Sequence, residues 1–385
     1  MERARILILT ASIGSGHLRA AEAIRAALAS HPQAGAMQVD VVDFMAREVS
    51  AVHYLMKRIY LMMLRFVPDL YDVFFRIAGK KTSGGIVRGV FAQVMVRTMG
   101  RIIRAYAPDL VIATHPFPEG AAALWRMRHG SSFSLAALMT DYALHTMWLV
   151  QGVDIYFVAT ESMAAEMAAR GFAPQTVHAM GIPITCADDG LTRRTARESV
   201  GLSEDLPTLL LMGGGLGLGG IDRTLAAVET VERRLSVLVA AGHNAALEMH
   251  ARRLAETSRH DMHVFSYTDA IPALMRAADL LITKPGGLTL SEAFAAGLPL
   301  LLHDPIPGPE TENAIYATRC GAAVWLHPGE SMAAAVEEIL AHRLSKMRRA
   351  ARDCACADAA QRVAAMLMEH LTRERGTVYG TEKNA

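Results

Sequence analysis

Short runs of apolar residues recur along the chain, and each is bounded by glycine, proline or polar turns. We expect buried strands at residues 4–9, 38–43, 109–113, 134–139, 154–159 and 177–180 in the first half, and at residues 208–212, 236–241, 261–265, 280–282 and 298–302 in the second. Helical spacing separates several of these runs, as in residues 18–29 and 160–172. Strands that alternate with helices predict an α/β protein built on doubly wound sheets.

A length of 385 residues favours two domains. The first strand, glycine turn and helix open a doubly wound domain that we expect to span residues 1–183. A polar, charged stretch at residues 185–207 is the expected connection, so a second α/β domain is predicted from residue 184. From residue 326 to about Glu374 the pattern is helical, and the last ten or so residues are expected to fray.

Glycine-rich turns follow three of the predicted strands. They read TASIGSGH at residues 10–17, GGGLGLGG at residues 213–220 and KPGG at residues 284–287. A strand, a glycine turn and a helix N-terminus form an anion site, because free N–H groups and the helix dipole favour negative charge there. The first turn lacks the dinucleotide fingerprint and the second lacks the Lys-Ser/Thr of a P-loop, which disfavours NAD binding and ATP hydrolysis.

The turn at residues 284–287 leads into a helix that Thr289 or Ser291 can cap, with Glu292 expected in its first turn. Glu292 would then accept hydrogen bonds from sugar hydroxyls. A second proline–glycine loop follows the strand at residues 298–302, and it is expected to carry Glu310, Glu312 and Asn313.

Polar residues also follow two strands of the first half. Pro116 restricts His115 to extended backbone, so residues 114–118 are expected to form a loop. The other segment, residues 140–148, reads TDYALHTMW. Both loops should open on the same side of the sheet as His17. His17 itself can serve as a base or can simply satisfy the helix N-terminus, and the loop position alone does not separate these alternatives.

The formal net charge of +1 conceals a strong asymmetry. Residues 44–106 contain eleven Lys or Arg and three acids, a net of +8, so the rest of the chain carries −7. Basic residues alternate there with Leu, Met, Tyr and Phe at helical spacing. Such helices can lie in a membrane interface and contact an anionic surface. An ordinary core face with a solvated back remains the alternative.

The four cysteines are scattered, and Cys354 and Cys356 lack a second ligand pair, so we predict free thiols and no metal site. No window has about 18 uncharged apolar residues, so no transmembrane helix is predicted. The first residues enter a strand directly, so we expect no signal peptide and a cytoplasmic location.

The segment PGGLTLSEAFAAGLPLLLHDPIPGPETEN resembles the nucleotide-sugar signature of the GT-B glycosyltransferases of the monogalactosyldiacylglycerol synthase and diacylglycerol glucosyltransferase group, and more distantly the lipid II N-acetylglucosaminyltransferase. The group pattern is PGG-x-T-x-x-E-A followed by P-x-P-G-Q-E-x-x-N, and Pro309 stands where Gln is usual. The resemblance implies donor contacts from Gly16, Gly213, Gly214, Gly215, Tyr267, Thr268, Pro285, Gly286, Gly287, Thr289, Glu292, Glu310 and Asn313.

The first half carries the same resemblance, because SIGSGH occupies the family's G-x-G-H loop and TDYALHTMW its T-D-x-x-x-H-x-x-W segment. His17 is then the implied catalytic base, with Asp141 and His145 as further catalytic candidates. Acceptor-binding roles fall on His115, Pro116 and Trp148, although packing is the alternative for His145 and Trp148.

The resemblance implies a GT-B fold, with two Rossmann-like domains facing a central cleft. The nucleotide-sugar domain would span residues 184–345, and residues 346–385 would form a C-terminal helix that crosses back to the first domain. No D-x-D motif occurs, and the expected reaction requires no metal or cofactor.

The implied activity is inverting transfer of glucose or galactose from a UDP-sugar to diacylglycerol, on the inner face of the cell membrane and without nucleic acid as a partner. A polyprenyl-linked or other lipid acceptor, and a non-enzymatic nucleotide-sugar sensor, are the alternatives.

Overall fold

A computed structural model describes residues 3–66, 81–130, 133–185, 191–202, 206–213 and 220–382. The chain divides into two compact units, and each is described by itself. The first unit takes Met1–Thr185 together with Asp358–Ala385, and the second takes Cys186–Ala357.

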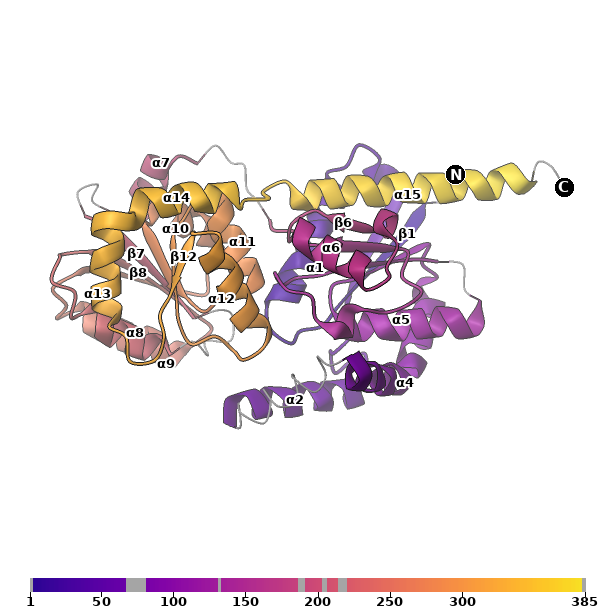
Figure 1. Cartoon of the computed structure of the whole chain (residues 1–385), viewed down its shortest axis with the longest axis horizontal. Helices are drawn as coiled ribbons and strands as arrows, with labels where there is room; N and C mark the ends of the chain where they lie inside the picture. The colour runs from indigo at the N-terminus through magenta and orange to yellow at the C-terminus, as the bar shows by residue number, and fades with distance from the viewer. Residues whose placement is uncertain are drawn as a thin grey trace. The chain divides into compact units, whose positions relative to one another are not determined.

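The first unit contains a six-stranded parallel sheet in the order β2-β1-β3-β4-β5-β6 (Figure 1). Its strands are β1 (Ala4–Thr10), β2 (Met37–Asp43), β3 (Leu110–Ala113), β4 (Ser134–Leu138), β5 (Ile155–Val158) and β6 (Val177–Ala179). In the register, Ile6 of β1 lies between Val39 of β2 and Leu110 of β3. Nearly every residue of β1, β3, β4 and β5 is buried, as expected for parallel strands covered by helices on both faces.

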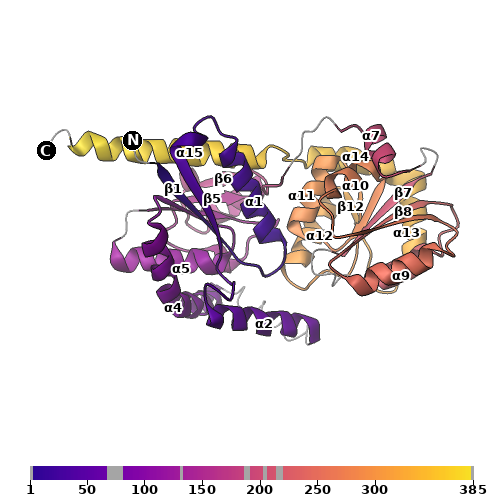
Figure 2. The ribbon, with the colours of Figure 1, turned by 180° about the vertical axis from the view of Figure 1, so that it is seen from behind.

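The helices of the first unit include the C-terminal helix of the chain. They are α1 (Gly16–Ala29), α2 (Ala51–Phe66), α4 (Lys81–Tyr106), α5 (Pro116–His129), α6 (Glu161–Ala169) and α15 (Ala359–Glu382), with short 3-10 turns η1 (Ala34–Ala36), η2 (Thr146–Trp148) and η3 (Pro174–Thr176). Figures 1 and 2 both show α15 running alongside α1, and His370 of α15 lies 2.9 Å from the hydroxyl of Ser134 on β4. The helix extends past the predicted end at Glu374.

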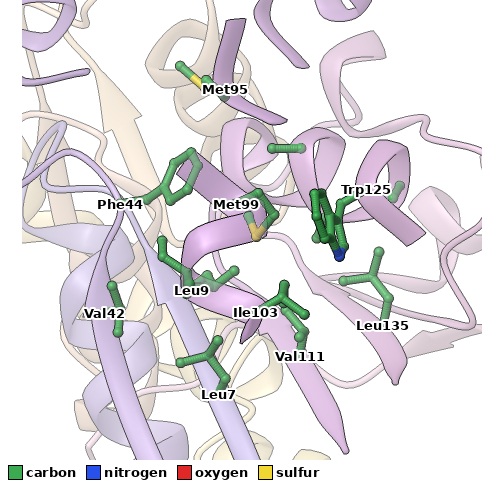
Figure 3. Close-up of a cluster of buried hydrophobic side chains, with 14 of the residues drawn as sticks. Leu7, Leu9, Val42, Phe44, Met95, Met99, Ile103, Val111, Trp125 and Leu135 are labelled. Atoms are coloured by element: carbon green, nitrogen blue, oxygen red, sulfur yellow. The ribbon is translucent and has the colours of Figure 1, made fainter. Parts of the chain in front are cut away.

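The core of the first unit lies between the sheet and the helices α4 and α5 (Figure 3). Met95 and Met99 of α4 and Trp125 of α5 pack there against residues of β1 and β3. A Cβ atom on Gly100 would lie only 2.2 Å from the Trp125 ring, so the glycine allows α4 to approach α5 closely. One face of α4 therefore anchors much of the basic segment, residues 44–106, in the core.

The second unit contains another six-stranded parallel sheet, in the order β12-β11-β10-β7-β8-β9. Its strands are β7 (Thr208–Met212), β8 (Ser236–Gly242), β9 (Asp261–Ser266), β10 (Leu280–Thr283), β11 (Leu300–Leu302) and β12 (Ala323–Trp325). The sequence reading missed β12, a strand of three residues that pairs with β11 at the edge of the sheet. Counted from β7, the order is that of the doubly wound dinucleotide-binding fold.

The helices of the second unit are α7 (Arg193–Ser199), α8 (Ile221–Val228), α9 (Ala245–Ala255), α10 (Ile271–Ala277), α11 (Gly287–Ala296), α12 (Pro309–Arg319), α13 (Met332–Glu338), the π-helical turn η4 (Ile339–Arg343) and α14 (Leu344–Asp353). Buried Asp279, just before β10, accepts hydrogen bonds from Arg193 of α7, Arg348 of α14 and the backbone N–H of Thr208. One carboxylate therefore connects two helices to the central strands, and its charge is balanced by both guanidinium groups.

Candidate active site

The chemical residues of the first unit gather at the point where its strand order reverses. Strand β1 has β2 on one side and β3 on the other, so the chain leaves β1 and β3 toward opposite faces of the sheet. In open α/β sheets ligands bind outside the carboxyl ends of the strands at such a switch point. The loop after β1 leads to His17, and the segment after β3 carries Thr114 and His115.

His17 occupies the second position of α1 and contacts the ends of two other strands. Its Nδ1 atom lies 2.8 Å from the carbonyl oxygen of Thr114 and 2.9 Å from the hydroxyl oxygen of Thr140. A carbonyl oxygen can only accept, so Nδ1 carries the proton and donates it to Thr114. Nε2 is then the basic nitrogen of the neutral imidazole. The Thr114 hydroxyl donates in turn to the His17 carbonyl at 3.1 Å.

Burial of the imidazole lowers the pKa of His17, because desolvation disfavours its charged form. The negative charge of Asp141 and the hydrogen bond to the Thr114 carbonyl partly oppose this shift. The net result is an imidazole that is neutral at neutral pH, with one ring nitrogen oriented by the protein. That is the state a general base needs.

His115 lies against His17, and the two rings meet edge to face with centroids 4.6 Å apart. Desolvation, reinforced by the neighbouring His17, lowers the pKa of His115 well below its usual range. Its Nδ1 accepts a hydrogen bond from the Phe117 N–H and so caps helix α5. The expected loop at residues 114–118 was therefore wrong beyond His115. Pro116 begins α5, because the first helical position suits proline's fixed φ and missing N–H.

The segment after β4 brings Asp141, His145 and Trp148 to the same end of the sheet. His145 caps the turn η2 by accepting from the Met147 N–H at 3.3 Å. Trp148 is 4% exposed, so its indole packs inside the unit. Asp141 is the member of this segment that acts electrostatically on His17.

Polar contacts that the sequence did not predict hold the loop before His17 in place. Ser12 donates its backbone N–H to Asp43 Oδ1 at 3.0 Å and its hydroxyl to Asp43 Oδ2. The ammonium group of Lys57, on α2, donates to the Ser12 hydroxyl oxygen. Asp43 ends β2, and its place at a strand's carboxyl end was the available signal. The contact with Lys57 spans 45 residues and had no local signal.

The second unit has its own switch point, between β7 and β10. Gly213 follows β7 directly, whereas Gly214 and Gly215 lie outside the described residues. The turn at Lys284, Pro285 and Gly286 follows β10. Gly213 and the turn at residues 284–286 therefore both lie at the carboxyl ends of the strands that border this switch point, where the doubly wound fold binds nucleotides.

Gly286 is the N-cap of α11, and Gly287 begins the helix. The expected cap at Thr289 or Ser291 was wrong, because both lie inside the helix and Ser291 donates to the Gly287 carbonyl at 2.9 Å. Glu292 is half-buried and lies one turn further along than expected. The first N–H groups of α11 have no acceptor within the helix, so they are available to an anion.

Glu310 and Asn313 belong to the first turns of α12, not to the preceding loop as expected. The Glu310 carboxylate accepts from the Ile306 N–H at 2.6 Å and pairs with the Lys284 ammonium at 3.3 Å. The Lys284 and Glu310 side chains are 10% and 17% exposed, so the pair is screened little by solvent. It connects the loop before α12 to the turn after β10. Asn313 is fully buried.

An exposed aromatic pair follows β8 and β9. The rings of His243 and Tyr267 stack with centroids 4.2 Å apart and 10° between their planes, and Tyr267 is 63% exposed. Thr268, the other expected base contact, accepts a hydrogen bond from the Ala270 N–H at 3.1 Å. His243 was not singled out from the sequence, although it closely follows a predicted strand, as other site residues do. A flat stacked pair at the carboxyl edge of the sheet suits a planar base.

Helix α2 exposes apolar side chains on one face, which we name the apolar stripe. The stripe consists of Val52, Leu55, Ile59 and Met62, each between 54% and 59% exposed. These positions recur at the spacing that defines one helical face. Val90 and Val94 of α4 are also exposed.

Within the described ranges no helix is long and apolar enough to cross a membrane. No set of three or more His, Cys, Asp or Glu that could hold a metal ion occurs in those ranges.

Similarity to known proteins covers both units. Residues 17–184 match the family described as monogalactosyldiacylglycerol (MGDG) synthase, and residues 208–366 match the glycosyltransferase family 28 C-terminal domain. A processive diacylglycerol beta-glucosyltransferase of Bacillus cytotoxicus is 32% identical over 83% of this chain and 81% of its own length. Another from Bacillus cereus is 31% identical over 90% and 88%.

Solved structures share the fold at lower identity. MurG of Acinetobacter baumannii aligns with a TM-score of 0.62 at 17% identity over 95% of this chain and 99% of its own. The calicheamicin glycosyltransferase CalG4 aligns with a TM-score of 0.60 at 15% identity over 96% and 99%. The two Rossmann-like units are those of the GT-B fold. The chain belongs to the diacylglycerol glycosyltransferase family that contains MGDG synthases and processive diacylglycerol beta-glucosyltransferases.

Proposed function

We propose that this protein transfers a hexose from a UDP-sugar to diacylglycerol with inversion at the anomeric carbon. The observation that carries the proposal is His17, a neutral imidazole whose Nδ1–H is held by the Thr114 carbonyl at 2.8 Å. Nε2 of such a residue can take the proton of an acceptor hydroxyl as that hydroxyl attacks. The relatives named as diacylglycerol glucosyltransferases support diacylglycerol as the acceptor and glucose as the first donor sugar to test.

The chemistry assigns separate tasks to the two units. In the first unit His17 acts as the base, Asp141 stabilises the imidazolium formed during transfer, and His115 lies beside them at the acceptor position. Proton transfer to a positioned base accounts for about 10²- to 10⁴-fold in rate. When base and leaving group act on opposite sides of the anomeric carbon, an α-linked donor gives a β-linked product.

In the second unit the first turn of α11 receives the pyrophosphate of the donor, with Gly286 and Gly287 allowing close approach of the backbone. Negative charge grows on UDP as it leaves, and N–H groups fixed at a helix N-terminus stabilise that charge without rearranging. Glu292 accepts hydrogen bonds from the ribose, and Tyr267 with His243 stacks on the uracil. The Lys284–Glu310 pair holds the loop beside this position.

The acceptor is a lipid, so the first unit has to reach the head-group plane. We infer that the apolar stripe of α2 inserts into that interface while Arg58 and the other exposed basic residues of residues 44–106 meet an anionic surface. A net of +8 in this stretch supports an anionic partner. The action is therefore peripheral, on the cytoplasmic leaflet where the UDP-sugar is available.

The test is a matrix of donors and acceptors. UDP-glucose and UDP-galactose are each incubated with vesicles that contain dioleoylglycerol or a polyprenyl phosphate, and the lipids are analysed by mass spectrometry. We expect hexosyl-diacylglycerol, with the preferred donor identified by rate and any di- or trihexosyl product revealing repeated transfer. His17→Ala is the matched inactive control. Binding of UDP without any lipid product would instead identify a nucleotide-sugar sensor.

A further inference from the structure

Helix α2 exposes apolar side chains and turns polar ones inward, which is the reverse of an ordinary surface helix. Its outward face carries the apolar stripe, whereas its inward face carries a cation, Lys57, together with buried His53. The His53 ring lies 3.1 Å from the Phe44 carbonyl and anchors the start of the helix. Lys57 was expected among the residues that meet lipid head groups. The structure turns its ammonium group toward Ser12 instead, and Ser12 is bonded to the carboxylate of Asp43.

Helix α4 repeats this arrangement. Val90 and Val94 face outward, while the guanidinium of Arg88 reaches inward and donates to the carbonyl of Thr146 at 2.9 Å. Thr146 belongs to the turn η2, between His145 and Trp148. Glu119 is fully buried, and the positive charge of Arg88 partly opposes the rise in its pKa that burial causes.

Helices α2 and α4 therefore each combine an exposed apolar face with one basic side chain that contacts a loop of the proposed acceptor site. Lys57 contacts the loop that leads from β1 into α1 and positions His17, five residues after Ser12. Arg88 contacts the loop that contains His145 and follows Asp141. A side chain meant for an anionic surface would be expected to extend outward into solvent, as long basic side chains do when unpaired. Both instead make partly buried, charge-assisted hydrogen bonds.

We propose that Lys57 and Arg88 are positioning residues that couple the seating of α2 and α4 on the lipid surface to the geometry of the acceptor site. This inference rests on the proposed function. When the apolar faces insert into the lipid, helices α2 and α4 are fixed in position. Lys57 then holds the loop before His17 at a fixed distance from α2, and Arg88 holds the loop of His145 at a fixed distance from α4. Both cations should therefore act on turnover by the bound enzyme, not on membrane affinity.

The experiment separates turnover from affinity. Lys57→Met and Arg88→Met keep the apolar stems and remove the charged ends, while Lys57→Arg and Arg88→Lys keep the charges. Arg25→Met, an exposed position of α1 outside residues 44–106, is the matched control. For each protein we would measure kcat at saturating vesicles of phosphatidylglycerol, phosphatidylcholine and dioleoylglycerol, vesicle affinity by sedimentation, and UDP affinity by calorimetry.

We expect Lys57→Met and Arg88→Met each to lower kcat by about tenfold or more while vesicle and UDP affinities stay within about twofold. The charge-keeping variants should recover most of kcat, and Arg25→Met should match the wild type. If Lys57→Met does not fold, Ser12→Ala removes the other partner and should reproduce the loss. In the pair Lys57→Met and Ser12→Ala the losses should not add, because one contact is removed twice.

A kcat at saturating vesicles equal to that of the wild type would overturn the inference and leave the proposed function intact. A loss confined to vesicle affinity would also overturn it, because these cations would then be head-group contacts. Absence of lipid product from the wild-type protein would overturn both proposals.

Discussion

The Nδ1 atom of His17 lies 2.8 Å from the carbonyl oxygen of Thr114, a residue 97 positions later in the chain. The hydrogen bond selects the imidazole tautomer, because only a protonated Nδ1 can donate to a carbonyl. It also orients the ring from the carboxyl end of β3. The nitrogen left basic is Nε2, so the expected consequence of losing the ring is a loss of proton transfer.

Replacement of His17 by Ala should lower kcat for transfer to diacylglycerol by about 10²- to 10⁴-fold, because a positioned base contributes that factor. UDP affinity should remain near the wild-type value, because the nucleotide is assigned to the second unit. Steady-state kinetics and calorimetry on the same preparation check both expectations. Turnover near the wild-type rate would move the base to another residue, with Asp141 or His145 next.

The pH dependence of kcat/KM should reflect the lowered pKa of His17. A base works when it is unprotonated, so activity should persist above the His17 pKa and fall as pH drops through it. Since burial lowers that pKa from 6.5, the midpoint of the acid limb should lie below 6.5. Asp141→Asn removes the charge that raises the pKa and should move the limb to still lower pH. A limb that moves to higher pH would contradict this electrostatic assignment.

Glu119 should make the first unit less stable as pH rises. Its carboxyl group is fully buried, neither oxygen has a hydrogen-bond partner among the described residues, and desolvation raises its pKa well above 4.5. Well below pH 4.5 the group is neutral in both states. Above it the unfolded chain ionises first, so stability falls as pH rises toward the folded-state pKa, by up to about 1.4 kcal/mol per pH unit.

Glu119→Gln removes this ionisation and keeps the shape. The variant should therefore unfold at higher denaturant concentration than the wild type at pH 8, with the gap closing toward pH 4.5. Urea titrations at several pH values measure the gap. A constant gap across this range would show that Glu119 does not titrate between the folded and unfolded states.

Glu292 and Tyr267 provide separate tests of the donor site. Glu292→Ala should cost about 1.5–3 kcal/mol of UDP affinity if its carboxylate accepts from the ribose. Tyr267→Ala should cost about 1–3 kcal/mol through lost base stacking. Calorimetric titration with UDP measures both. Glu248→Ala, a partly exposed position on α9 that pairs with Arg252, serves as the control, and unchanged UDP affinity in either test variant would remove that residue from the site.

The apolar stripe should supply the part of membrane binding that salt does not screen. Replacing Leu55 and Ile59 with Ser should weaken sedimentation with anionic vesicles even at high salt, because apolar insertion is independent of ionic strength. Arg58→Gln should weaken it mainly at low salt, by about 1 kcal/mol for the charge near the surface. Equal binding of all three proteins to anionic and neutral vesicles would show that α2 does not contact lipid.

The sequence alone was sufficient for eleven of the twelve strands that the structure describes and for the GT-B resemblance, because these depend on local spacing. All eleven runs that were predicted as strands form strands, and the family relationship is confirmed over both units. The starts of two helices were predicted wrongly. Pro116 and Pro309 each begin a helix that was read as loop, since proline favours both a turn and a first helical position.

The tertiary structure decided what each polar side chain contacts. Parallel pairing brings Thr114 and Thr140 beside His17, although 97 and 123 residues separate them along the chain. Periodicity placed Lys57 on an amphipathic helix but could not say which face meets the sheet. The direction is set by packing of His53 and Met56 against the core, which leaves the apolar stripe outside and turns Lys57 toward Ser12. Contacts of this kind depend on long-range packing, and no local pattern encodes them.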